Sequence, residues 1–211
     1  MGRFCPECQR EVAEERKREA LQRQAAERDA RRTSAGIPPR FRNAALDGVP
    51  AELARFADDP ASMPAGFILL GPPGTGKTYA ACAVAIALAD ARKWAAYMTA
   101  KHAVRRVKAM WRKDAESTEE MVADWFRGLD LLILDEAGAD LGGPLEAAVV
   151  TDIVSDRHAE EKPTILIGNL APGDLASAYG DRVVDRYREG GKVLVFSGPS
   201  RRGRANAAGK A

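Results

Sequence analysis

One octapeptide in the sequence has the residue types and the spacing of a phosphate-binding loop. Glycines in such a loop let backbone N–H groups turn towards phosphate oxygens, and the start of the following helix adds partial positive charge. Lys77 would supply a charge to the β- and γ-phosphates, and Thr78 would ligate Mg²⁺. The pattern G-x-x-x-x-G-K-[ST] is matched in full by Gly71, Pro72, Pro73, Gly74, Thr75, Gly76, Lys77 and Thr78, with Tyr79 beside it. These residues predict a site for ATP and Mg²⁺.

Two adjacent carboxylates, Asp135 and Glu136, follow the apolar run 131–134. We expect Asp135 to hold the Mg²⁺ shell, because this ion prefers hard oxygen ligands, and Glu136 to orient and deprotonate the attacking water. A protein that uses ATP only as a switch would not need the second carboxylate. Asn169, after another apolar run, could contact the γ-phosphate or the water, although such a residue is also common in turns. The pair predicts ATP hydrolysis, with solvated strand-end acids as the alternative, and we expect it to face the loop from a neighbouring strand.

Short apolar runs predict the strands that position these groups. Runs of this kind, bounded by glycine or polar residues, are typical of parallel strands that are covered on both faces. We expect strands at 67–70, 131–134, 164–167 and 193–196, and a further one at 95–99. Helices are predicted at 46–57, 77–90, 100–113 and 118–127. The alternation predicts an α/β fold, a three-layer P-loop NTPase sandwich with a mainly parallel sheet.

The chain divides into three parts by composition. Residues 9–33 are dense in Arg, Glu, Gln and Ala, which predicts a solvated helix that ends before Gly36, because Pro38 and Pro39 favour extended backbone. We expect 1–35 to be an N-terminal segment that contains cysteines and could bind a partner. The ATPase domain would span 36–202. The tail, 203–211, is rich in Gly, Ala, Asn and Arg and is expected to be disordered.

Composition argues against a membrane protein and against a secreted protein held together by disulfides. The 211 residues, 45% hydrophobic and 29% charged, suit one α/β domain with short appendages. No run approaches the roughly 18 to 20 apolar residues of a membrane span, and the N-terminus lacks the apolar core of a signal peptide. Three cysteines do not form the even framework of a secreted protein. We therefore expect a cytoplasmic protein without membrane contact.

A possible nucleic-acid surface lies on the helix predicted at 100–113. The net charge of +2 is small, so nucleic-acid binding must depend on where the charges lie. Spacings of four, three and four residues place four cations on one face: Lys101, Arg105, Lys108 and Arg112. Such a stripe could contact a phosphate backbone, and an ordinary solvated helix face is the alternative. Trp111 is expected to pack on the domain, and His102 and His158 to be structural.

Cys5 and Cys8 have the spacing of half a zinc site. A closed structural zinc site needs four ligands, and the sequence offers only these two here. A remnant or shared Zn²⁺ site and a pair of free thiols therefore remain equally open.

The motifs together resemble the DnaC/IstB-like branch of AAA+ ATPases over residues 36–202. The resemblance is carried, in order, by the phosphate loop and by residues 131–138 (LLILDEAG), 163–170 (PTILIGNL) and 180–186 (GDRVVDR). It implies that Asn169 is a sensor of the γ-phosphate and that Arg182 or Arg186 supplies an arginine finger to a neighbouring subunit. A second sensor would fall at Arg202, although the tryptophan usual in that motif is missing here.

The same resemblance implies partners. Members of the family are replicative helicase loaders or transposition helpers that act as ATP-dependent oligomers on DNA. For this chain it implies a helicase loader that assembles with a DnaB-like hexameric helicase and with single-stranded DNA, and that self-associates. A transposition helper that binds duplex DNA is the alternative within the family. A small nucleotide kinase and a non-hydrolysing ATP-switch adaptor are alternatives of other classes.

Overall fold

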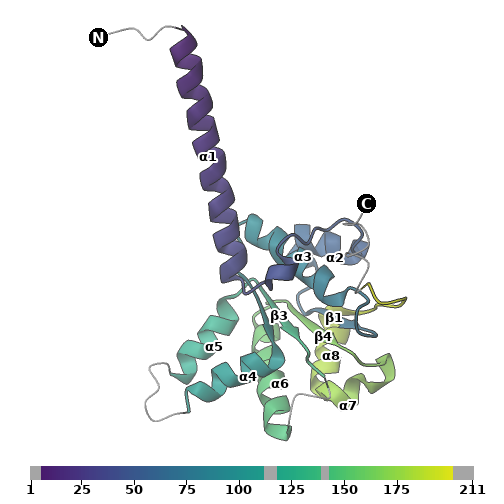
Figure 1. Cartoon of the computed structure of the whole chain (residues 1–211). Coiled ribbons are helices and arrows are strands. Elements are labelled where there is room, and N and C mark those ends of the chain that lie inside the picture. The colour runs from purple at the N-terminus through teal and green to yellow at the C-terminus, as the bar shows by residue number, and fades with distance from the viewer. Residues whose placement is uncertain (1–5, 112–117, 139–142, 202–211) are drawn as a thin grey trace.

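The computed structural model describes residues 6–111, 118–138 and 143–201, and within them the strands form one parallel sheet (Figure 1). The strands are β1 (Gly66–Leu70), β2 (Ala95–Thr99), β3 (Leu131–Asp135), β4 (Thr164–Gly168) and β5 (Gly191–Val195). Their order across the sheet is β2-β3-β4-β1-β5, and all pairings are parallel. The α/β three-layer prediction is confirmed. One detail was wrong: β3 is not next to β1, because β4 lies between them.

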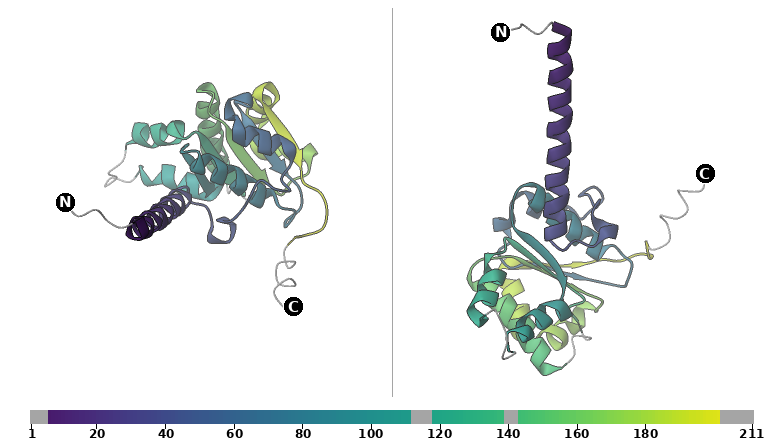
Figure 2. Two further views of the ribbon diagram at one scale, coloured as in Figure 1. Left: turned by 90° about the horizontal axis from the view of Figure 1, so that it is seen from above. Right: turned by 60° about the vertical axis from the view of Figure 1, so that its left-hand side comes forward.

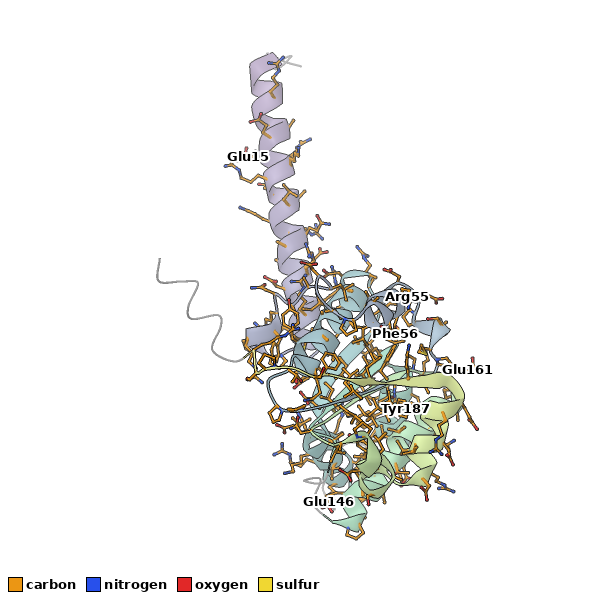
Figure 3. All side chains as sticks on the ribbon, turned by 90° about the vertical axis from the view of Figure 1, so that its right-hand side faces the viewer. Glu15, Arg55, Phe56, Glu146, Glu161 and Tyr187 are labelled. Atoms are coloured by element: carbon orange, nitrogen blue, oxygen red, sulfur yellow. The ribbon has the colours of Figure 1, made fainter. Side chains whose placement is uncertain are left out.

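Helices cover both faces of the sheet. One face packs against α2 (Ala51–Asp58) and α3 (Lys77–Asp90). The other face is covered by α4 (Ala100–Ala109), α5 (Glu119–Gly128), α6 (Pro144–Ala159), α7 (Leu175–Tyr179) and α8 (Asp181–Gly190). Successive side chains of β1, β2, β3 and β4 alternate between two apolar clusters, so the central strands are buried on both faces. Figure 3 shows Phe56 and Tyr187 inside the body, one from each cluster.

The first helix, α1 (Pro6–Ser34), projects from this body (Figure 1 and the right-hand view of Figure 2). Its last turns are fixed to α3, because the guanidinium groups of Arg28 and Arg32 lie 3.0 and 2.8 Å from Asp90 Oδ2. The helix ends before Gly36, as predicted. Most of its described side chains are exposed, so it does not belong to either core. No helix in the described residues is both long and apolar enough to cross a membrane.

Several boundaries differ from the prediction. The helix expected at 46–57 begins only at Ala51, because Pro50 disfavours helical backbone at the residue before it and is itself the N-cap. The helix expected at 100–113 ends at Ala109, and the prediction that Trp111 packs on the domain was wrong, because this side chain is 54% exposed. The helix α6 was not predicted.

A buried arginine joins α6 to the sheet. Arg157 is 0% exposed, and its guanidinium donates hydrogen bonds to the carbonyl oxygens of Phe126, Leu129 and Pro163 and to Thr164 Oγ1. Burial lowers the pKa of Arg157 to about 10, so the group is still charged at neutral pH. These bonds hold the start of β3 and the start of β4 in place, and thereby the two strands whose opposite ends carry Asp135 and Asn169.

Candidate active site

The loop 71–76 connects β1 to α3 at the carboxyl edge of the sheet. Gly71 has φ of 129°, and a Cβ atom there would lie 2.0 Å from the carbonyl oxygen of Phe196, so only glycine fits. Lys77 is 5% exposed, and its Nζ donates to the carbonyl oxygens of Gly71 at 2.6 Å and Pro72 at 2.9 Å. The lysine therefore lies over the loop, where a phosphate bound by the backbone N–H groups would meet it.

Asp135 is placed directly against the start of α3. Asp135 is 8% exposed, and its Oδ2 accepts a hydrogen bond of 2.9 Å from Thr78 Oγ1. Its other oxygen, Oδ1, accepts one of 2.8 Å from the backbone N–H of Glu136. A hydroxyl and a carboxylate in contact at the end of a phosphate loop are hard oxygen donors that fit Mg²⁺. The structure thus brings together the two residues predicted as metal ligands.

Glu136 and Asn169 follow adjacent strands at the same edge. Glu136 is exposed and has φ of 55°, a left-handed backbone that is uncommon for residues other than glycine. Asn169 is also exposed and comes directly after β4, the strand between β1 and β3. The carboxyl ends of these three parallel strands meet at one edge, where open α/β sheets bind ligands. The phosphate loop, the two acids and Asn169 therefore all lie at this edge of the sheet.

Tyr97 is a residue of this site that the sequence did not indicate. Its hydroxyl donates a hydrogen bond of 2.7 Å to Asp135 Oδ2. Burial, and then the neighbouring Asp135 carboxylate, raise the pKa of Tyr97 well above its usual range, so the phenol remains a donor.

On α3, burial raises the pKa of the Cys82 thiol to about 12, which makes it an unreactive core side chain.

The arginines predicted as finger candidates both lie on α8. Arg182 is exposed, whereas Arg186 is half-buried and its Nε donates to Ser155 Oγ of α6 at 3.1 Å. Arg202 lies outside the described residues. Just before it, the backbone N–H of Arg201 donates to the carbonyl oxygen of Gly74 at 2.8 Å, so the segment after β5 passes over the phosphate loop.

The predicted basic stripe is only partly available. Lys101 and Arg105 are exposed on α4, but Lys108 Nζ lies 2.5 Å from Glu146 Oε1 of α6. Arg112 lies outside the described residues. Of the three predicted cations that the structure describes, Lys101 and Arg105 face solvent and Lys108 is paired.

The structure does not test whether Cys5 and Cys8 bind zinc. Cys5 lies outside the described residues, and the side chain of Cys8 is not described. Among the described side chains, no group of three or more His, Cys, Asp or Glu residues could hold a metal ion.

The sequence is similar to those of known ATP-binding proteins and helicase loaders. A family model for IstB-like ATP binding proteins matches residues 10–206. The replicative helicase loader DnaC of Escherichia coli is 30% identical over 141 residues, which are 66% of this chain and 57% of that protein. A putative ATP-binding protein of the insertion sequence IS21 from Pseudomonas aeruginosa is 29% identical over 140 residues, 64% of this chain and 51% of the relative. The chain thus spans just over half the length of these curated relatives.

Solved structures with a similar fold include a helicase loader. The crystal structure of the DnaC helicase loader matches with a TM-score of 0.66 at 21% identity, covering 76% of this chain and 100% of that chain. This likeness shows that the two chains share a fold. Since the family model extends over most of the sequence, the chain belongs to the family of IstB-like ATP binding proteins.

Proposed function

We propose that this chain binds ATP with Mg²⁺ at the carboxyl edge of its sheet and hydrolyses it. The observation that carries the proposal is the 2.9 Å hydrogen bond between Thr78 and Asp135, which are 57 residues apart in the chain. Backbone N–H groups of the loop and Lys77 would hold the phosphates, and Thr78 and Asp135 would hold Mg²⁺. The ion, when bound, would offset phosphate charge. Glu136 would accept a proton from the attacking water, which Asn169 would help to orient.

Two variants test these roles. Lys77→Ala should abolish ATP binding, measured with a fluorescent ATP analogue, because the loop loses its phosphate-facing charge. Lys192→Ala is the matched control, since Lys192 is an exposed residue that pairs with Glu52 at 3.0 Å. Glu136→Gln should bind ATP normally and release little phosphate. Normal ATP binding by Lys77→Ala would show that the loop 71–78 is not the ATP site.

We further propose that an arginine of α8 completes the site of a neighbouring subunit. A guanidinium delivered in trans would neutralise charge that develops on the γ-phosphate, which couples assembly to hydrolysis. Arg182→Ala and Arg186→Ala should each be mixed with Lys77→Ala. Each arginine variant keeps an intact phosphate loop, and Lys77→Ala keeps both arginines. Hydrolysis should therefore recover when Lys77→Ala is mixed with the variant that lacks the finger arginine. No recovery in either mixture would rule out a finger on α8.

We propose a helicase as the partner of α1. The relatives named as replicative helicase loaders support this assignment, and α1 projects from the body with its exposed side chains free to pack on another protein. Removing residues 1–22 leaves Arg28 and Arg32 on Asp90 and should abolish capture of the replicative helicase while ATP binding persists. Equal capture by the shortened chain would place the helicase contact elsewhere.

Single-stranded DNA would contact the exposed cations of α4. Replacing Lys101 and Arg105 by Gln should weaken the binding and reduce the slope of log affinity against log salt by about 1.4, at about 0.7 for each phosphate contact. Arg55→Gln is the control, because Arg55 is an exposed cation on α2 (Figure 3). An unchanged slope in the double variant would show that α4 is an ordinary solvated face.

A transposition helper is the second candidate. The IS21 relative and the family model favour it. A pull-down with and without ATP separates the two functions, since a loader should retain the replicative helicase and a helper should retain a transposase. Stronger binding to duplex than to single-stranded DNA would also favour the helper.

A further inference from the structure

Tyr97 reaches Asp135 diagonally across two paired strands. The Cα atoms of β2 and β3 pair Tyr97 with Ile133 and Thr99 with Asp135. Residues two apart on a strand share a face, so Tyr97 and Asp135 are diagonal neighbours on the face that packs against α3. The distance between diagonal neighbours can be spanned by a long aromatic side chain, and the hydroxyl of Tyr97 donates to Asp135 Oδ2 at 2.7 Å.

We propose that Tyr97 is a positioning residue for the metal-holding carboxylate. Three donors from three elements reach Asp135: Thr78 of α3 and Tyr97 of β2 at Oδ2, and the backbone N–H that follows β3 at Oδ1. The hydroxyl of Thr78 would also have to serve Mg²⁺, whereas the hydroxyl of Tyr97 donates to the Asp135 carboxylate and is not a predicted metal ligand. Tyr97 therefore fixes the plane of the carboxylate in the orientation that an incoming ion requires.

The backbone of Tyr97 is itself fixed from the outer side of the sheet. β2 is an edge strand, yet the N–H of Tyr97 donates to the carbonyl oxygen of Ala35 at 2.7 Å. The next residue, Gly36, has φ of 70°, and a Cβ there would lie 2.5 Å from the carbonyl oxygen of Tyr97. The chain just after α1 thus fits closely along β2 at this residue. A side chain that starts from a backbone held on both sides can orient another group.

The proposal rests on the proposed Mg²⁺ site and is tested by binding rather than by turnover. The Mg²⁺ concentration for half-maximal binding of a fluorescent ATP analogue should be measured for Tyr97→Phe, Tyr187→Phe and Asp135→Asn, each beside its melting temperature. Tyr187→Phe is the matched control, because Tyr187 is a buried phenol that donates to the carbonyl oxygen of Thr164, at the opposite end of β4 from Asn169.

Tyr97→Phe should raise the half-maximal Mg²⁺ concentration about three- to tenfold, since the carboxylate loses one of the donors that orient it for the ion. Binding in EDTA should not change, and Tyr187→Phe should alter the melting temperature alone. An unchanged or lower Mg²⁺ requirement in Tyr97→Phe, or an equal rise in Tyr187→Phe, overturns the proposal. If Asp135→Asn also leaves the Mg²⁺ requirement unchanged, the metal site itself is wrong; if only Asp135→Asn raises it, the failure concerns Tyr97.

Discussion

Replacing Glu136 with glycine has two effects that can be measured separately. It relieves the left-handed backbone just after β3, and it removes the carboxylate. Glu136 has φ of 55°, where an L-residue suffers a contact between Cβ and the carbonyl oxygen that glycine avoids. The chain offers a matched control in Glu161, which has φ of 52° after the end of α6, far along the sequence from the phosphate loop. Strained backbone conformations cluster at active sites.

The expected stability change follows from two opposing contributions. Relief of the left-handed strain is worth about 1–2 kcal/mol, and the extra freedom of glycine in the unfolded chain costs about 0.4–1 kcal/mol. Glu136→Gly should therefore leave the free energy of unfolding unchanged or raise it by about 1 kcal/mol, which corresponds to a melting temperature higher by about 2–4 °C. Glu136→Ala keeps the Cβ atom and should be less stable than the glycine variant by about 1 kcal/mol.

Turnover should behave differently at the two positions. Loss of a general base lowers the rate about 100- to 10,000-fold, so Glu136→Gly and Glu136→Ala should both be nearly inactive, whereas Glu161→Gly should hydrolyse ATP at the wild-type rate. Urea denaturation and phosphate release measure the two effects on the same preparations. Wild-type turnover by Glu136→Gly would refute the base assignment. A glycine variant less stable than the alanine variant would refute the argument from strain.

Two further predictions concern packing and charge. Arg157→Met should lower the free energy of unfolding by about 3 kcal/mol, because buried carbonyl oxygens lose their donor, while Arg188→Met, at an exposed ion pair, should change it by about 0.5 kcal/mol or less in the same urea titration. The hydrogen bond from Lys108, with further ones from the backbone, lowers the pKa of Glu146 from its ordinary value of 4.5 to about 2. The ionised Glu146 therefore stabilises the fold above pH 4.5, and this contribution disappears as pH falls towards 2. The melting-temperature advantage of the wild type over Glu146→Gln should shrink across that window; a constant advantage would contradict it.

Most of the sheet could be predicted because its strands are short apolar runs with clear ends. The runs at 67–70, 131–134 and 164–167 lie within the observed strands, since burial on both faces leaves little room for polar residues. The run at 193–196 was displaced by up to two residues, because β5 is an edge strand with exposed valines. The strand order and the helix α6 depend on packing between distant segments, which no local pattern encodes.

The site could be predicted where a motif specifies it. The phosphate loop and the acids after β3 fall at one edge because their spacing relative to apolar runs determines where they lie. Tyr97 was missed because its contact with Asp135 spans 38 residues and depends on the register of β2 and β3. Arg157 was missed because a charged residue is expected at the surface unless its partners are known. Trp111 was wrongly placed in the core because α4 ends before it.

Lys77, Thr78, Asp135 and Glu136 should all act on one bound ATP molecule. The most direct measurement is the identity of the nucleotide that remains bound after a single turnover with radiolabelled ATP and Mg²⁺. ADP should remain on the wild-type protein and intact ATP on Glu136→Gln, and Lys77→Ala should retain no nucleotide. Equal amounts of ADP on the wild type and on Glu136→Gln would contradict it.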